Sequence, residues 1–281
     1  MGFRMSVKSV GLYVCYSRLR QDFNSEILMS INDSICEGDS IASKGRHYGE
    51  LKVSYWIWKN AKEDIVGLFH YRRFLNLGND DTKCGGIRSD FASVYGLQEN
   101  RIRAIMNKYD IILPNKYPKI VKNKTPSVYD YYAREHCQKD MDVTLEVINE
   151  KYPHMYSLAN KMLKEEKQSY GANIIIAKKN IFDEYAKWLF DILFEVENRI
   201  HEDVLLRDEY QQRVYGFISE RLMAVFVEYL VRNKGIKVLE VPLLFVEVDR
   251  MKYMRYCIKK IKRKLLKLIG FGKKECNLYV K

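Results

Sequence analysis

The feature that most constrains the fold is a short apolar run that ends in a cluster of polar side chains. Residues 65–69 (Ile-Val-Gly-Leu-Phe) carry no polar side chain, and His70, Tyr71, Arg72 and Arg73 follow them directly. A run of this kind is typical of a strand that is buried on both faces of a parallel sheet. In open α/β sheets, ligands bind beyond the carboxyl ends of the strands. The pattern therefore predicts an α/β fold with a binding site that begins at His70.

Arg72 and Arg73 are candidate ligands of phosphate groups, because planar guanidinium groups bind phosphate oxygens in bidentate geometry. The alternative is an ordinary surface pair of arginines after a strand. Residues 48–60 favour a site, because this aromatic-rich segment predicts a helix that leads directly into the strand. We expect the core-facing stripe of this helix to consist of Leu51, Tyr55 and Trp58.

Several short segments of the chain together resemble one bacterial family of unknown function, found in capsule, exopolysaccharide and O-antigen gene clusters and regarded as glycosyltransferase-like. The segments lie, in the order of that family, at residues 38–41, 48–51, 55–60, 67–74, 109–114 and 212–222. The resemblance implies a glycosyltransferase-A-like catalytic domain over residues 1–249. Its fold would be a mixed, Rossmann-like, nucleotide-binding sheet flanked by helices.

The family resemblance and the expected sheet together suggest which residues bind a nucleotide-sugar donor. The first loop after the first strand of such a sheet meets the base and ribose, although Tyr16 at that strand end is also explained by simple packing. By resemblance, Asn173 lines the sugar pocket. The full set that we expect on the donor side is Tyr16, Arg18, Ser40, Lys44, Arg72, Arg73 and Asn173.

The expected catalytic residues are His70 and Glu220. The resemblance places Glu220, with Arg221, at the start of a predicted helix that faces the cleft, and a base is needed to deprotonate the acceptor hydroxyl. Glu50 lies in a segment shared with the family and is a candidate for a supporting role. On the acceptor side we expect Tyr132, His136, Arg213 and Arg221, with a structural role as the alternative for His136.

A metal ion is not expected to take part. Metal-dependent enzymes with the resembled fold hold Mn²⁺ with an Asp-x-Asp motif at this strand end, whereas here His70, Tyr71, Arg72 and Arg73 occupy the position. The resemblance therefore implies that guanidinium groups replace the metal. The alternative is a metal site at residues 79–81 (Asn-Asp-Asp), which lie in a turn-rich segment.

The charge of the chain is concentrated at its end. The net charge is +12, and residues 250–281 hold twelve Lys and Arg against one acid, Glu275. A nearly neutral body argues against nucleic-acid binding, which needs basic surface throughout the fold. The apolar positions of residues 250–274 recur with helical spacing, which predicts a basic amphipathic helix on an anionic membrane surface. A helix packed on the body is the alternative.

The six cysteines show no metal-binding spacing, and we interpret them as reduced thiols. With neither a signal peptide nor a membrane-spanning segment expected, the predicted location is cytoplasmic, on the inner face of the plasma membrane. The predicted function is transfer of a sugar from a nucleoside-diphosphate sugar to a lipid-linked or glycan acceptor in surface polysaccharide synthesis. The resemblance favours UDP as the nucleotide, with galactose or galactofuranose as candidate sugars. A non-catalytic sugar- or phosphate-binding partner of a polysaccharide assembly is the alternative.

Overall fold

The structure is a computed structural model of the chain. It describes residues 9–17, 20–78, 87, 89–247, 251, 254, 255 and 258. Arg18 and the acids Asp80 and Asp81 therefore lie outside the described residues. The same holds for nearly all of the predicted membrane-binding segment, whose described residues Met251, Met254 and Ile258 are exposed.

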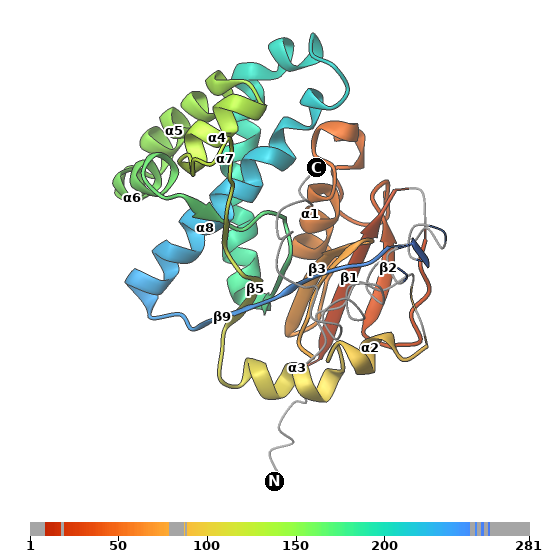
Figure 1. Ribbon diagram of the computed structural model, residues 1–281. Coiled ribbons are helices and arrows are strands. Elements are labelled where there is room, and N and C mark those ends of the chain that lie inside the picture. Colours follow the sequence, from red (N-terminus) through yellow and green to blue (C-terminus); the bar gives the residue numbers. More distant parts are fainter. Residues whose placement is uncertain are drawn as a thin grey trace.

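The centre of the fold is a mixed sheet of eight strands (Figure 1). Six of them lie side by side in the order β2 (Leu28–Asn32), β1 (Val10–Tyr16), β3 (Ile65–His70), β8 (Ile175–Lys178), β5 (Ile111–Pro114) and β9 (Val238–Val241). β4 (Arg73–Leu75) folds back on the end of β3, and β10 (Leu243–Phe245) pairs with β4. Among the six, only β8 runs antiparallel to its neighbours. The carboxyl ends of β1, β2, β3, β5 and β9 therefore meet at one edge of the sheet.

Both faces of β3 are buried, as the apolar run predicts. Side chains alternate between faces along a strand, so Val66 and Leu68 face one core cluster while Ile65 and Phe69 face the other. The first cluster includes α1 (Leu51–Asn60) and α7 (Lys179–Leu205), and the second includes α2 (Phe91–Val94) and α3 (Glu99–Met106). The neighbours of β3 differ from expectation in one respect, because one of them is the antiparallel β8.

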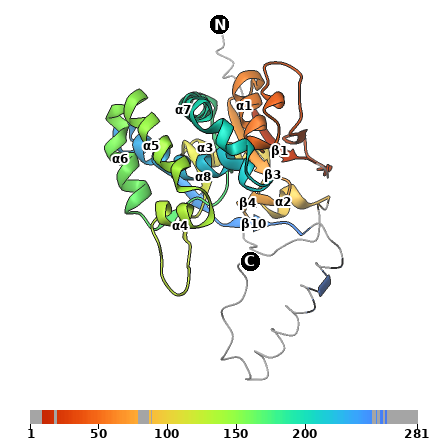
Figure 2. The same cartoon turned by 90° about the horizontal axis from the view of Figure 1, so that it is seen from above.

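A group of helices packs beside the sheet. It consists of α4 (Val128–Glu135), α5 (Gln138–Lys151), α6 (Pro153–Lys164), α7 and α8 (Val214–Lys234). Figure 2 shows α5 and α6 on the side of α7 and α8 that faces away from the sheet. Two 3-10 turns, η1 (Ala42–His47) and η2 (Gln211–Arg213), and a short ribbon of β6 (Tyr117–Pro118) and β7 (Gln168–Ser169) complete the described elements. No helix of the described residues is both long and apolar enough to cross a bilayer.

Two local expectations need correction. On α1, Leu51 is buried as expected, and Tyr55 and Trp58 face the core and pack on Phe190 of α7 but stay half-buried. Val53 and Ile57, outside the expected stripe, are fully buried. The sheet and α7 both cover α1, so its buried surface is wider than a single stripe. The second correction concerns α8, which begins at Val214, so Glu220 lies in its second turn rather than at its start. The expected mixed α/β sheet flanked by helices is confirmed.

Candidate functional site

The site begins where β3 ends. His70 is the last residue of β3 and pairs with Arg73, the first residue of β4, across a tight turn formed by Tyr71 and Arg72. The Nδ1 atom of His70 is buried and has no hydrogen-bond partner among the described residues. Buried polar atoms are nearly always paired. This nitrogen is therefore an exception that the described part of the chain leaves unpaired.

A chain of hydrogen bonds fixes the residues that face His70. The Asn173 side chain precedes β8 and donates from Nδ2 to Oε1 of Glu50 at 2.9 Å and to the carbonyl oxygen of Gly216 at 3.3 Å. Its Oδ1 accepts a 2.8 Å hydrogen bond from the Ser219 hydroxyl. Both Asn173 and Ser219 are buried. Asn173 thus links the start of α1, the sheet and α8, and it sets the orientation of the Glu50 carboxylate.

Arg213 lies on the solvent side of this chain. Its Nη2 atom is 3.8 Å from Oε2 of Glu50, and the Arg213 side chain is 44% exposed. Gly216, one turn into α8, is buried, yet a Cβ atom added there would meet no atom within 4 Å. Open space therefore adjoins the backbone between Arg213 and Glu220.

Glu220 is a partly buried carboxyl group in this site. It accepts a 2.8 Å hydrogen bond from Nη1 of Arg221, and its side chain is 20% exposed. Burial raises the pKa of Glu220 to about 7, and the negative charge of Glu50 raises it further, against the lowering effect of Arg221, Arg73 and Lys119. A carboxyl with this pKa can take up or release a proton near neutral pH.

The pKa of His70 is shifted in the opposite direction. Burial lowers the pKa of His70 to about 4, and the nearby charges of Arg73, Arg213 and Arg72 also lower it, whereas Glu50 raises it. The imidazole is therefore neutral at neutral pH. The three arginines that act on it make the surroundings of His70 attractive to anions.

The two neighbouring arginines differ in position. Arg73 acts on both His70 and Glu220 and is half-buried in β4. Arg72 is exposed, with its guanidinium 6.0 Å from the Tyr71 ring. Arg73 is thus the arginine at the centre of the cluster, and Arg72 lies at its rim.

The residues expected on the acceptor side form a second, adjoining group. His136 stacks on Phe217 with 4.1 Å between ring centroids, and burial lowers the pKa of His136. The buried Arg221 lies over the Tyr132 ring at 5.3 Å and donates to the carbonyl oxygen of Phe217. Tyr132 is 0% exposed, so it lies beneath this group rather than at a surface.

Three residues expected at the donor form no hydrogen bond or ion pair with the cluster in the described part of the chain. The Ser40 hydroxyl donates to the carbonyl oxygen of Ile35, and Lys44 donates to Glu197 at 2.7 Å. Tyr16 is half-buried at the carboxyl end of β1. The described contacts of Ser40 and Lys44 are thus internal to the fold.

Lys119 and Ser219 were not predicted from the sequence. Ser219 lies within the family-like segment 212–222, so that segment was a signal for it. No sequence signal identified Lys119. It follows the short β6 strand, and its charge reaches Glu220 only through the tertiary fold.

One group of described residues has the composition of a metal site. Cys137, Asp140 and Asp203 bring potential ligand atoms within 4.8 Å of one another. Arg207, however, donates to both oxygens of Asp140 at 2.8 and 2.7 Å and to Asp203 at 2.6 Å. The guanidinium already pairs with both carboxylates, so the group is an ion-pair network.

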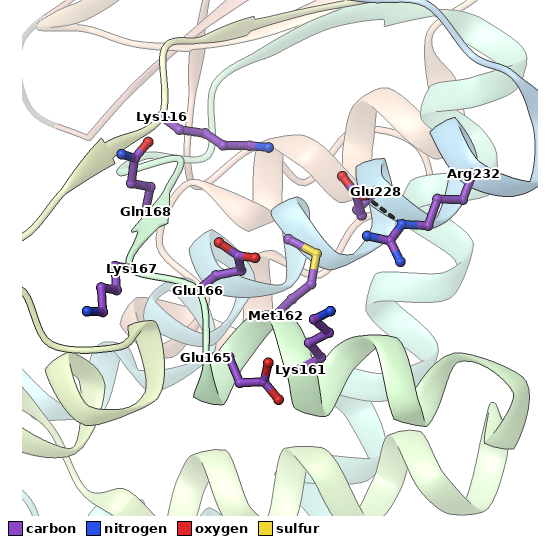
Figure 3. A pocket seen from close by; sticks show the side chains of 9 residues that line it. All are labelled: Lys116, Lys161, Met162, Glu165, Glu166, Lys167, Gln168, Glu228 and Arg232. Atoms are coloured by element: carbon purple, nitrogen blue, oxygen red, sulfur yellow. Dashed lines mark hydrogen bonds and ion pairs between the residues drawn. The ribbon is translucent and has the colours of Figure 1, made fainter.

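A cavity of about 530 Å³ lies farther along α8 (Figure 3). Its wall mixes acids and bases, namely Lys116, Lys161, Glu165, Glu166, Lys167, Glu228 and Arg232, with Met162 and Gln168. No predicted site residue lines it. The two residues that α8 contributes to this wall, Glu228 and Arg232, pair with each other at 2.6 Å.

Comparison with known proteins assigns the chain to a family. A search of curated proteins found no match. Among solved structures, the chain is similar to the apo structure of the WbbM bifunctional glycosyltransferase, with 27% identity and a TM-score of 0.76. The match covers 85% of this chain and 45% of that one, so this chain spans less than half of its structural relative. Residues 20–233 match the family described as Domain of unknown function (DUF4422). The chain therefore belongs to the DUF4422 family.

Proposed function

We propose that the protein is a glycosyltransferase that moves a sugar from a nucleoside-diphosphate sugar to a hydroxyl group of an acceptor. The observation that carries the proposal is Glu220, a carboxyl with a pKa of about 7 that lies among arginines at the carboxyl edge of the sheet. A carboxyl that titrates near neutrality in such a place has the properties of a general base. The likeness to a solved glycosyltransferase supports the assignment.

In the proposed reaction, Glu220 takes the proton of the acceptor hydroxyl. The acceptor oxygen forms a bond to the anomeric carbon as the bond from that carbon to the diphosphate oxygen breaks. The electron pair of the broken bond stays on the leaving diphosphate. Attack on the face opposite the leaving group inverts the configuration at the anomeric carbon.

Arg73 is proposed to bind the leaving diphosphate, with Arg72 at the rim, because guanidinium groups stabilise charge that develops on phosphate oxygens. The reaction would then need no metal ion. His70 is neutral at neutral pH, and we propose that its ring hydrogen-bonds to a donor hydroxyl. Since both polar atoms of the Asn173 side chain are engaged, we assign Asn173 to the positioning of Glu50 rather than to contact with the sugar.

The wider setting is also part of the proposal. The donor would be a UDP-linked sugar, with galactose and galactofuranose as candidates, and the acceptor a glycan or lipid-linked glycan of a surface polysaccharide. Tyr16 and Arg18 would contact the base and ribose. The basic segment 250–274 would hold the protein on anionic lipid at the inner face of the membrane.

The test is a panel of nucleotide sugars, screened first by thermal stabilisation and then by turnover with and without EDTA. A donor that binds raises the melting temperature by mass action. Release of the nucleoside diphosphate, to an acceptor or to water, supports the transferase. Stabilisation by a nucleotide sugar without any turnover would instead favour a non-catalytic binding protein. Loss of activity in EDTA and recovery with Mn²⁺ would contradict the metal-free reaction.

The membrane proposal is tested separately by truncation after Glu247. The truncated protein should lose salt-sensitive binding to vesicles that contain an anionic phospholipid. Equal vesicle binding by the full-length and truncated proteins would contradict a membrane role for the segment.

A further inference from the structure

Three aromatic rings form a continuous surface beside the catalytic cluster. The Tyr210 and Phe217 ring centroids are 5.1 Å apart, and those of His136 and Phe217 are 4.1 Å apart. The Tyr210 ring is inclined by only 28° to that of His136, at 6.1 Å. Tyr210 is 57% exposed, so the stack ends in a ring that is open to solvent.

Buried and hydrogen-bonded side chains hold the stack in place. Tyr132, fully buried, contacts His136 with 4.9 Å between their centroids. Gln211 pairs with Nδ1 of His136 at 3.0 Å, and its amide donates to the carbonyl oxygen of Glu135 at 2.9 Å. The exposed ring therefore rests on an ordered base, which lowers the entropy cost of binding a ligand against it.

The stack also adjoins the proposed base. Phe217 precedes Glu220 by three residues on α8, and side chains three or four apart lie on one helix face. Arg213, four residues before Phe217, has its guanidinium 5.9 Å from the Phe217 ring and 3.8 Å from Glu50. A ligand on the Tyr210 ring can thus extend along this helix face toward Glu220.

The charges around Tyr210 favour a neutral ligand. Asp208 accepts a hydrogen bond from the Tyr210 backbone at 2.9 Å, and Glu209 pairs with Arg46. Arg46 balances the charge of Glu209, and the remaining carboxylate of Asp208 disfavours a phosphate group or an anionic lipid surface beside the ring. The face of an aromatic ring is electron-rich and attracts weakly positive hydrogens. The C–H hydrogens on the less polar face of a sugar ring have this character.

We propose that Tyr210, His136 and Phe217 form an aromatic platform that binds a neutral sugar ring of the acceptor. The assignment of this sugar to the acceptor rests on the proposed transferase function, whereas the binding of a sugar ring does not. The platform holds the ring by stacking, and Glu220, farther along α8, binds the reacting hydroxyl.

Saturation-transfer NMR on the full-length protein tests the platform with defined probes, the methyl glycosides of galactose, glucose and N-acetylglucosamine. Spectra are recorded with and without UDP. Wild-type protein should transfer saturation to the ring C–H protons of at least one glycoside in the presence of UDP. Tyr210→Ala should weaken that binding by about fivefold, the scale of one aromatic contact.

Two variants serve as controls. Tyr210→Phe keeps the ring and should keep the signal. Leu206→Ala alters an 88% exposed apolar side chain on the same segment between α7 and η2 and should also keep it. An equal loss in Leu206→Ala would indicate a general apolar docking surface and overturn the platform.

Three other results overturn the inference. The first is that the wild type transfers saturation to none of the glycosides, and the second is an unchanged signal in Tyr210→Ala. The third is displacement of the glycoside by UDP, which would assign the bound sugar to the donor side. The measurement does not depend on turnover. A protein that turns over nucleotide sugars without binding glycosides therefore contradicts the platform alone, and one that binds glycosides without turning over any nucleotide sugar contradicts the transferase.

Discussion

Two carboxyl groups in this protein, the buried Asp140 and the partly buried Glu220, have opposite surroundings. Asp140 is 0% exposed and accepts hydrogen bonds on both oxygens from Arg207, with a further one at 3.1 Å from the Tyr132 hydroxyl. Glu220 accepts one hydrogen bond, from Arg221, and also experiences the like charge of Glu50. Burial raises the pKa of Glu220 to about 7.

The difference shows how a fold separates structural from reactive charge. A buried carboxylate with a bidentate guanidinium partner is compensated and stays where it is. A buried carboxyl with too few partners gains a raised pKa, which is costly for stability but useful for proton transfer. We therefore interpret the Asp140–Arg207 network as structural and the Glu220 cluster as functional.

The largest effect should come from Glu220→Gln. This change keeps the shape of the side chain and removes the base, so turnover of the nucleotide sugar should fall by about 10²- to 10⁴-fold. Glu228→Gln is the matched control, because Glu228 lies two turns farther along α8 and pairs with Arg232. Near-normal turnover in a folded Glu220→Gln protein would reduce Glu220 to a structural partner of Arg221.

Asp140→Asn should act on stability instead. Breaking a buried ion pair costs about 3–5 kcal/mol, because the remaining charge loses its partner. Urea unfolding measures the loss in the free energy of unfolding. Asp203→Asn, at the 46% exposed end of the same network, should cost no more than about 1 kcal/mol. An equal loss in the free energy of unfolding in the two variants would show that Asp140 contributes no more to stability than Asp203 does.

Arg73→Ala and Arg72→Ala test whether the arginines near Glu220 and His70 bind an anion. Arg73→Ala should weaken donor binding by about 1.5–3 kcal/mol, the scale of a hydrogen bond to a charged group. Arg72→Ala should have a smaller effect, because its guanidinium is exposed and screened by solvent. Calorimetric titration with the donor found by the panel gives both values. Unchanged affinity in both variants would remove the arginines from the donor site.

Gly216→Ala should have the smallest effect, and in the stabilising direction. Alanine is favoured over glycine inside a helix by about 0.5–1 kcal/mol, and the added Cβ meets no atom within 4 Å. Thermal unfolding should therefore show a slightly higher melting temperature. A lower melting temperature would mean that the space beside Gly216 is filled.

The sequence predicted the parts of the site that depend on local pattern. The apolar run before His70 predicted the strand and its polar end, and Ile65, Val66, Leu68 and Phe69 of that run are all buried. The choice of Asn173 and Glu220 came from the family resemblance. Neither residue carries a local pattern that marks it as functional.

The hydrogen-bond chain of the site could not be predicted in this way. Asn173 and Glu50 are 123 residues apart, and Asn173 and Ser219 are 46 apart, so their contacts depend on how the helices pack on the sheet. The same dependence explains α1, where packing against α7 left Tyr55 and Trp58 half-buried. Helix α6 was also not predicted, although Pro153 at its first turn is a helix-start signal.

The pH dependence of kcat/KM shows whether Glu220 acts as the base. Since burial holds Glu220 protonated up to a pKa of about 7, the base form accumulates only above that pH. If Glu220 is the base, kcat/KM should rise about tenfold per pH unit below pH 7 and level off above it. His70, with a pKa of about 4, does not titrate in this range. An active wild-type protein whose kcat/KM stays constant between about pH 5.5 and 8.5 would contradict a catalytic role for Glu220.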